Sequence, residues 1–313
     1  MKRNRGYEKP KDTEQFLYRM HRGLTDLDVS LALRTSKKLS HPVVFVIGAP
    51  RAGTTLLAQA ITYCYSAGYI TNLAARFWGA PLVGIELSHA VLGYDAPRDM
   101  GRDFFRSHYG STRGAGGLHE FGYFWKGWMD PRGDRQIERR CLWEMCGYVA
   151  MIQNRLGRPL VMKGALPALY APSVTAVLGK ENVRWVYIER GDTVGNCLSI
   201  LDARRAYFGR DDAWFGYDRP GLRGDLEYST KMLTPYEQIA GQVLELRQYY
   251  GRFATNTVLL AQLCTEPEAA LRGILSTPMR DLPSGAIQSR GTNGPREKEE
   301  VIFQKAIERY CDK

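Results

Sequence analysis

The sequence predicts an α/β fold of three layers, in which a mostly parallel central sheet carries helices on both faces. Three observations support this prediction. Short apolar runs rich in β-branched and aromatic residues recur at 43–48, 159–164 and 183–189, and stretches with helical periodicity separate them. Strands that alternate with helices form parallel sheets, because each helix returns the chain to the same edge. The first strand leads into a glycine-containing turn, GAPRAGTT, with the features of a P-loop-like phosphate-binding loop.

The elements of the N-terminal part follow from hydrophobic periodicity and chain breakers. Residues 13–38 repeat apolar side chains at helical spacing, and they belong to a helical lead-in of about 1–40 that a proline ends. VVFVIG is apolar throughout, as in a strand buried in a parallel sheet, and a helix should follow at 54–66. Residues 69–135 are rich in glycine and aromatic residues, so we expect irregular structure with one helix near 82–92.

The C-terminal part repeats the alternation of strands and helices. Strands are expected at 159–164, 183–189 and 257–263. Helices are expected at 136–156, 171–179, 192–207, 235–253, 266–275 and 297–310. Asp192 is a favourable N-cap residue for its helix, and the aperiodic segment 207–224 should be a long surface loop. Because no repeat or low-complexity linker interrupts the chain, we expect a single domain over 1–313.

Composition and charge narrow the class of protein. Hydrophobic residues make up 44% of the 313 residues and charged residues 24%, as in globular domains. The net charge of +10 favours an anionic partner, such as a nucleic acid, an anionic membrane or a polyanionic cofactor. No apolar run approaches the ~20 residues of a membrane span, and the basic N-terminus lacks the apolar segment of a signal peptide. The six cysteines are scattered without metal-binding spacing, so we expect reduced thiols in a cytoplasmic protein and no metal.

The loop GAPRAGTT indicates an anion site without the lysine of nucleotide triphosphatases. Gly48 and Gly53 have Walker A spacing, but Thr54 stands where that motif has its lysine, and the cation lies earlier, at Arg51. Backbone N–H groups, the helix N-terminus and the hydroxyls suit a 5′-terminal phosphate. The candidate phosphate-binding residues are Arg51, Ala52, Gly53, Thr54, Thr55 and Leu56. The alternative is a glycine-rich turn that binds no ligand.

PRAGTT resembles the 5′-phosphosulfate loop of sulfotransferases that use 3′-phosphoadenosine 5′-phosphosulfate (PAPS). In that family an arginine after a strand, followed by a helix with a serine, binds the 3′-phosphate. Arg190 and Ser199 of VRWVYIERGDTVGNCLS resemble this motif in its bacterial form. SRGTNGPREK, with Arg290 and Gly291, weakly resembles the family's loop that closes on the 3′-phosphate; otherwise it is a basic turn.

The segment HEFGYFW (119–125) also resembles one found in bacterial members, so the resemblance covers most of residues 43–276. It implies a P-loop-like fold, PAPS as co-substrate without a metal, and sulfuryl transfer to a hydroxyl or an amine of a small-molecule acceptor. We expect neither nucleic acid as a partner nor a membrane span. Residues 69–135 and 207–230 should form the acceptor pocket, and no motif in them names the acceptor.

The 3′-phosphate motif departs from the family pattern. Arg190 and Ser199 are nine residues apart, whereas the family usually has eight. Arg190 reaches the phosphate by a local shift, or another basic residue, such as Arg184 or Arg204, takes its role. Gly195 stands where the family has an aspartate before the helix.

The catalytic base is the less certain part of the site. Animal members have a histidine two residues after the strand lysine. Here the lysine is Lys163, and Ala165 stands at the position of the histidine. Lys163 and Arg51 are candidates to stabilise the leaving oxygen. The adjacent His119 and Glu120 are candidates for the base, and we favour Glu120; the alternative is a solvated turn pair. His89 and His108 are reserve candidates.

Two other functions remain open. A P-loop kinase or NTPase is disfavoured by the absent Walker lysine. A basic nucleic-acid-binding protein is permitted by the charge, although the sequence shows no pattern of a known nucleic-acid-binding motif.

Overall fold

The centre of the molecule is a five-stranded sheet with the order β2-β5-β1-β6-β7. The structure is a computed structural model that describes residues 4, 8, 10–93, 95–130, 136–217, 233–287 and 296–311. The strands of this sheet are β1 (Val43–Ile47), β2 (Gly68–Tyr69), β5 (Leu160–Lys163), β6 (Val183–Glu189) and β7 (Asn256–Leu259). Every pairing in the sheet is parallel, so the predicted α/β class is confirmed.

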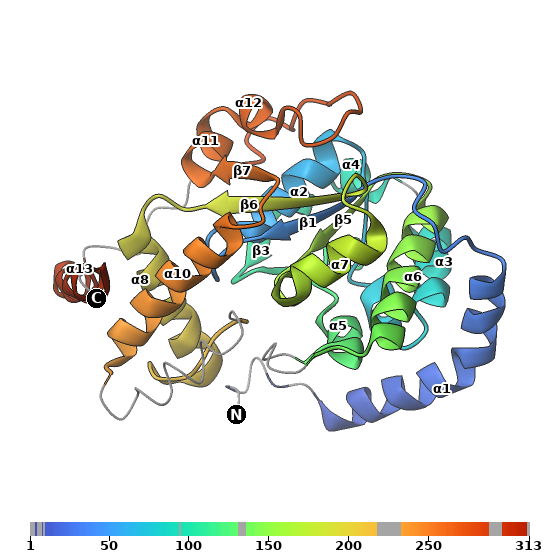
Figure 1. The fold of residues 1–313 in the computed structure, drawn as a ribbon, viewed down its shortest axis with the longest axis horizontal. Helices are drawn as coiled ribbons and strands as arrows, with labels where there is room; N and C mark the ends of the chain where they lie inside the picture. Colours follow the sequence, from blue (N-terminus) through green and yellow to red (C-terminus); the bar gives the residue numbers. More distant parts are fainter. Residues whose placement is uncertain are drawn as a thin grey trace.

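Helices cover both faces of the sheet (Figure 1). On one face α2 (Thr54–Cys64) packs on β1 and β5, and α12 (Pro267–Leu271) contacts α2. On the other face lie α7 (Ala171–Leu178) and α10 (Pro235–Gly251), of which α10 contacts β6. Right-handed crossovers explain this: α2 carries the chain from β1 towards β2, whereas α7 carries it in the opposite direction, from β5 to β6. The predicted three layers are therefore present.

The remaining elements surround these layers. The other α-helices are α1 (Lys11–Leu33), α3 (Pro81–Leu92), α4 (Ala96–Met100), α5 (Gly122–Trp128), α6 (Arg139–Leu156), α8 (Thr193–Phe208), α11 (Leu260–Thr265) and α13 (Glu297–Cys311). Short 3₁₀ helices are η2 (Ala74–Phe77), η3 (Gly101–Phe105) and η4 (Pro167–Tyr170), and β3 (Ser107–His108) pairs with β4 (Ser111–Thr112). In Figure 1, α1 and α3 lie at one end of the molecule and α8 and α13 at the other. Within the described ranges, no helix is long and apolar enough to cross a membrane.

The hydrophobic core contains the central strand β1 and the aromatic segment around Phe121, as the sequence predicts. All five residues of β1 are at most 1% exposed, as expected for the central strand, and Phe45 stacks on Trp185 of β6 with ring centroids 4.6 Å apart. Phe121, Phe124 and Trp125 of the aromatic segment are also buried. These side chains pack in the same hydrophobic core as the sheet.

Three predicted elements differ from the structure. The strand expected at 257–263 is wrong in its second half, because β7 ends at Leu259 and α11 begins at the next residue. A continuous apolar run does not distinguish a strand from a buried helix. The helix expected to reach residue 38 ends at Leu33, and the region 69–135 holds more regular structure than expected, including α5.

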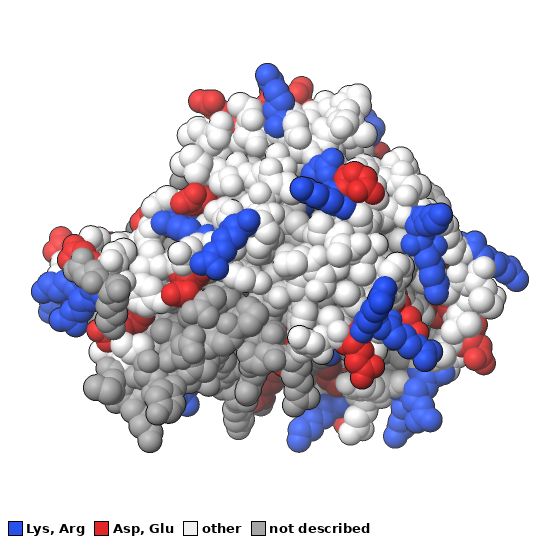
Figure 2. All heavy atoms as spheres, in the orientation of Figure 1, with Lys and Arg blue, Asp and Glu red and all other residues white. Residues whose placement is uncertain are grey.

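Opposite charges are interspersed on the surface. On the face shown in Figure 2, lysine and arginine side chains stand singly or in small groups, with acidic side chains among them. Ion pairs also fix α13 to α8: Arg205 Nη1 lies 2.9 Å from a Glu299 oxygen, and Arg296 Nη2 lies 2.8 Å from an Asp202 oxygen.

The buried carboxylate of Asp28 on α1 caps α3. It accepts hydrogen bonds from the backbone N–H groups of Leu82 at 2.8 Å and Val83 at 3.1 Å, at a helix end where these groups lack helical partners. We expect Asp28→Ala to lower the free energy of unfolding by about 1–3 kcal/mol, measured by urea denaturation. Asp26→Ala, on the exposed side of the same helix, is the control and should change it by less than about 0.5 kcal/mol. Equal effects of the two substitutions would contradict the capping role.

Candidate active site

Three neighbouring strands bring the predicted cations to one edge of the sheet. β1 leads into GAPRAGTT, β5 ends at Lys163, and β6 is followed by Arg190. Val46 of β1 pairs with Lys163 on one side and with Val186 on the other, so β1 and β5 end within one residue of each other and β6 continues to Glu189 at the same edge. In open parallel sheets, ligands bind outside this edge.

Glycines allow the loop to pack closely and to turn into α2. A side chain on Gly48 would come within 2.9 Å of Ile188 Cγ2, on the neighbouring strand. Gly53 has a φ of 106°, a conformation that favours glycine, and α2 starts at the next residue, Thr54. The N-terminal N–H groups of α2 therefore face the loop, as an anion site requires.

The Arg51 guanidinium contacts two other elements. Its Nε donates a hydrogen bond to Ser199 Oγ on α8 at 3.2 Å, and its Cζ lies 5.2 Å from the ring centroid of Tyr109. One helical turn before Ser199, the buried Asn196 donates to the carbonyl of Pro50 at 2.7 Å. Both motifs predicted from the sequence are therefore joined, because α8 contacts the loop at two points.

Lys163, Thr55 and Arg51 converge near Gly110. The Thr55 hydroxyl donates to the Gly110 carbonyl at 3.4 Å. A methyl group placed on Gly110 would lie 3.5 Å from Thr55 Oγ1, 3.8 Å from Arg51 Nη1 and 3.9 Å from Lys163 Nζ. One hydroxyl and two cations thus border the same space beside Gly110, an arrangement that can bind the oxygens of a tetrahedral anion.

Of the two candidate bases, Glu120 pairs with one of these cations, Lys163. Its Oε2 lies 3.4 Å from Lys163 Nζ, and its side chain is 40% exposed against 9% for the lysine. His119 Nδ1 accepts a hydrogen bond from the Phe121 N–H at 2.8 Å, so a neutral ring carries its proton on Nε2. His119 therefore holds the turn before α5, while Glu120 points to the convergence point through its ion pair with Lys163.

Arg190 folds back over the first turn of α8. Its Nη2 lies 3.4 Å from a carboxylate oxygen of Asp192, whose other oxygen caps the helix by accepting from the Gly195 N–H at 2.7 Å. A side chain on Gly195 would lie 2.6 Å from Arg190 Nη2. Gly195 and Ser199 are four residues apart, so they share a face of α8. The nine-residue spacing is accommodated by this turn, and glycine at 195 leaves room for it.

The two alternatives to Arg190 lie elsewhere. Arg184 is near the start of β6, at the opposite edge of the sheet, where it donates to backbone carbonyls. Arg204 is fully buried and donates to the Asp211 carbonyl at 2.9 Å. The predicted Arg290 and Gly291 lie outside the described residues.

Comparison with known proteins identifies the fold. Neither a protein-family model nor a curated protein sequence matches the chain. The sulfotransferase STF9 from Mycobacterium avium superimposes with a TM-score of 0.54 over 96% of this chain and 83% of its own, at 13% identity. The chain has the fold of this sulfotransferase. Sulfotransferase STF1 from Mycobacterium tuberculosis H37Rv matches 93% of this chain and 81% of its own with a TM-score of 0.48 and 11% identity.

Sequence reasoning missed parts of the site on this sulfotransferase fold. Tyr109 and Gly110 were not among the predicted residues, although HYGS has the form of a two-residue hairpin turn ending in glycine. The expected surface loop at 207–224 is packed in its described part: Trp214 is buried, and a side chain on Gly216 would lie 2.7 Å from Pro50 Cγ. Local sequence indicates neither the place of the hairpin tip beside Arg51 nor the packing of residues 207–217, because both depend on tertiary packing.

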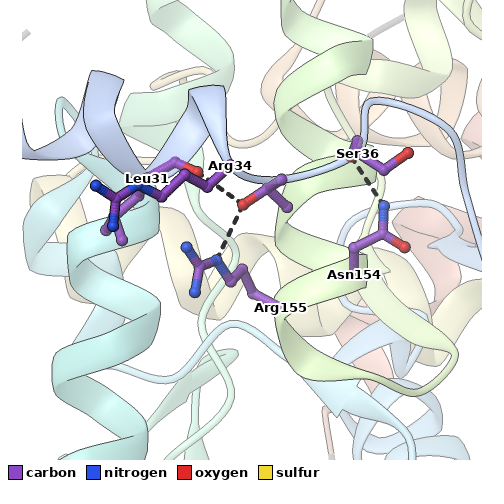
Figure 3. A pocket seen from close by; sticks show the side chains of 6 residues that line it. Leu31, Arg34, Ser36, Asn154 and Arg155 are labelled. Atoms are coloured by element: carbon purple, nitrogen blue, oxygen red, sulfur yellow. Dashed lines mark hydrogen bonds between the residues drawn. The ribbon is translucent and has the colours of Figure 1, made fainter.

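A concave region lies apart from these residues. It is a surface hollow of about 510 Å³, lined by Leu31, Arg34, Thr35, Ser36, Asn154 and Arg155 (Figure 3). Arg155 Nε donates to Thr35 Oγ1 at 3.1 Å, and Asn154 donates to the Ser36 carbonyl at 2.8 Å. These bonds hold the segment after α1 against α6, and none of the predicted site residues lines the hollow.

Proposed function

We propose that the protein is a sulfotransferase that moves the sulfuryl group of PAPS to a hydroxyl or an amine of a small-molecule acceptor. One observation carries the proposal: Arg51, Thr55 and Lys163 converge on one point in a chain with the fold of a sulfotransferase. Three donors that border the space beside Gly110 suit the oxygens of a sulfuryl group. The threonine at the Walker lysine position disfavours a nucleotide triphosphate.

The residues present fit both anionic groups of the donor. The loop N–H groups, Arg51 and the threonine hydroxyls would hold the 5′-phosphosulfate. Ser199 on α8 and Arg190, whose guanidinium lies beside Gly195 in the first turn of α8, would hold the 3′-phosphate. The hydrogen bond from Arg51 to Ser199 joins the two subsites directly. Burial raises the pKa of the Cys197 thiol, in the same motif, to about 12, so this cysteine stays protonated and has no nucleophilic role.

The chain's own residues supply charge and a base. When bound, PAPS supplies a sulfuryl group, whose bond to the phosphate oxygen breaks as the acceptor oxygen bonds to sulfur, and PAP leaves with the electron pair. Lys163 and Arg51 place positive charge where negative charge develops on the leaving oxygen. The Glu120 carboxylate takes the proton of the acceptor. Its ion pair with Lys163 keeps the base and the cation 3.4 Å apart.

Calorimetric titration with 3′-phosphoadenosine 5′-phosphate (PAP) in the presence of EDTA tests the proposal. We expect micromolar binding without a metal, because charge-assisted hydrogen bonds of about 1.5–3 kcal/mol form at each of two anion subsites. Binding of ATP with Mg²⁺ but not of PAP would favour a kinase or NTPase instead. Steeply salt-dependent binding of DNA or RNA without PAP binding would favour a nucleic-acid-binding protein.

Arg190 should distinguish ligands by their 3′-phosphate. We expect Arg190→Met to weaken PAP binding about 10- to 150-fold, because one charge-assisted contact is lost. Its effect on adenosine 5′-phosphosulfate, which lacks the 3′-phosphate, should be small. Gly195→Ala should show the same pattern, since its side chain would clash with Asp192 Oδ2 and come within 2.6 Å of Arg190 Nη2 and so displace the paired carboxylate and guanidinium together. Equal losses for both ligands would mean that Arg190 supports the fold and does not contact the 3′ group.

A further inference from the structure

The hairpin formed by β3 and β4 reaches the loop that carries Arg51. Tyr109 and Gly110 form its two-residue tip, with φ values of 47° and 85°. A type I′ hairpin turn needs positive φ at both central residues, and a tyrosine adopts this conformation only at a cost in free energy. A costly residue at the tip indicates that its side chain has a role there.

Contacts on two sides fix the position of the hairpin. Towards α8, Ser111 Oγ lies 3.5 Å from the Tyr207 hydroxyl, and the rings of Tyr109 and Tyr207 have centroids 6.2 Å apart. At the base, the Thr112 hydroxyl donates to the Leu118 carbonyl at 2.9 Å, and Asn72 donates to Thr112 Oγ1 at 3.0 Å. The tip is therefore held in a defined place beside the site.

Backbone strain is concentrated around the same point. Within the described ranges, four non-glycine residues have positive φ, and three of them, Arg51, Tyr109 and Phe121, border the site. Strained conformations persist where the surrounding structure imposes them, and they gather at functional sites. Arg51 and Tyr109 also contact each other, since the guanidinium carbon lies 5.2 Å from the ring centroid.

We propose that the hairpin tip completes the sulfuryl-transfer site, with Tyr109 as a positioning residue for Arg51 and Gly110 as the residue that keeps space for the transferred group. The inference rests on the proposed function, because it assumes that a sulfuryl group occupies the space beside Gly110 that Arg51, Thr55 and Lys163 border. A methyl group at position 110 would protrude into that space, at 3.5–3.9 Å from the three groups. It would exclude the sulfuryl group and leave the phosphate subsites unchanged.

The comparison of PAPS with PAP tests the role of Gly110 without knowledge of the acceptor, because PAP lacks only the sulfuryl group. We expect Gly110→Ala to weaken PAPS binding at least about 10-fold, the loss of one charge-assisted contact, and to leave PAP binding within about threefold. Gly114→Ala is the matched control: Gly114 also has a positive φ, 75°, but nothing lies within 4 Å of an added methyl group. It should leave the ratio of the two affinities unchanged.

The role of Tyr109 is tested by two substitutions that keep the same backbone cost. Tyr109→Phe keeps the ring over Arg51, whereas Tyr109→Leu removes it. We expect the leucine variant to release PAP from PAPS, with a panel of phenols as acceptors, about 3- to 30-fold more slowly, and the phenylalanine variant to stay within about threefold of the parent. Equal rates for the two variants would overturn the positioning role.

The results of these experiments distinguish a failure of the hairpin inference from a failure of the proposed function. If the parent protein binds neither PAP nor PAPS, the proposed function is wrong and the inference falls with it. If the parent binds both, but Gly110→Ala changes the ratio of affinities no more than Gly114→Ala does, the hairpin inference alone is overturned.

Discussion

Arg51→Met should weaken PAP binding about 10- to 150-fold, the loss expected for a charge-assisted hydrogen bond to phosphate. Arg51 is the cation of the loop, and its Nε bonds Ser199, the serine of the second motif. Methionine keeps the aliphatic stem. It also has the same Cβ at a φ of 66°, so the substitution adds no backbone strain that the arginine does not already carry. Calorimetry in EDTA gives the affinity directly.

Two further variants serve as a comparison and a control for Arg51→Met. Arg51→Lys keeps the charge but loses the planar fork, so we expect an intermediate loss. Arg184→Met removes the same side chain from the opposite edge of the sheet and should leave PAP binding unchanged. If Arg51→Met binds PAP as tightly as Arg184→Met does, the loop is a structural turn and the assignment of the 5′ subsite is wrong.

The parts of the fold that sequence predicted are those set by local patterns. β1 is a continuous apolar run buried in the sheet, β6 is buried in the sheet over Trp185–Ile188, and Asp192 caps α8 as its residue type suggests. α11 escaped prediction because the apolar run VLLA (258–261) crosses the boundary between β7 and α11, and a short apolar run alone does not decide between strand and helix. α5 escaped prediction because its aromatic residues satisfy tertiary packing and do not follow helical propensity.

For the candidate site, sequence supplied the groups but not their arrangement. Arg51 and Ser199 belong to separate motifs, and only the packing of α8 on the loop joins them across 148 residues of chain. The irregular spacing from Arg190 to Ser199 has a physical account only once the Asp192 cap and the small Gly195 are seen together. Tyr109 was missed because its contact with Arg51 depends on where the hairpin lies.

The pairing of Glu120 with Lys163 leaves two possible roles for the carboxylate. As a general base it would remove the proton of the acceptor hydroxyl. As a positioning group it would only hold the Lys163 ammonium at its distance of 3.4 Å. Since Glu120 is 40% exposed, the ion pair itself contributes little to the free energy of unfolding. Glu120→Gln and Lys163→Met should therefore each leave the protein folded. The two roles predict different results when Lys163 is changed as well.

Glu120→Gln should slow sulfuryl transfer about 10²- to 10⁴-fold with PAP affinity near that of the parent, because glutamine keeps the size but cannot accept the proton. Turnover is scored as PAP released from PAPS with a panel of phenols and aliphatic alcohols. The loss should be largest for the alcohols, whose hydroxyls need most help to lose a proton. His119→Asn should cost less, since its amide oxygen can replace Nδ1 as acceptor of the Phe121 N–H.

A double-mutant cycle with Lys163→Met then decides between the roles. If Glu120 acts only by holding the lysine, Glu120→Gln should have no further effect once Lys163 is methionine. If Glu120 is the base, the substitution should slow transfer by a similar factor in both backgrounds, and the difference between alcohols and phenols should persist. A reversed pattern, with Glu120→Gln active and His119→Asn inactive, would make His119 the base. Activity in both variants would place the base elsewhere, and His108, beside Tyr109 on the hairpin, would then be the next residue to substitute.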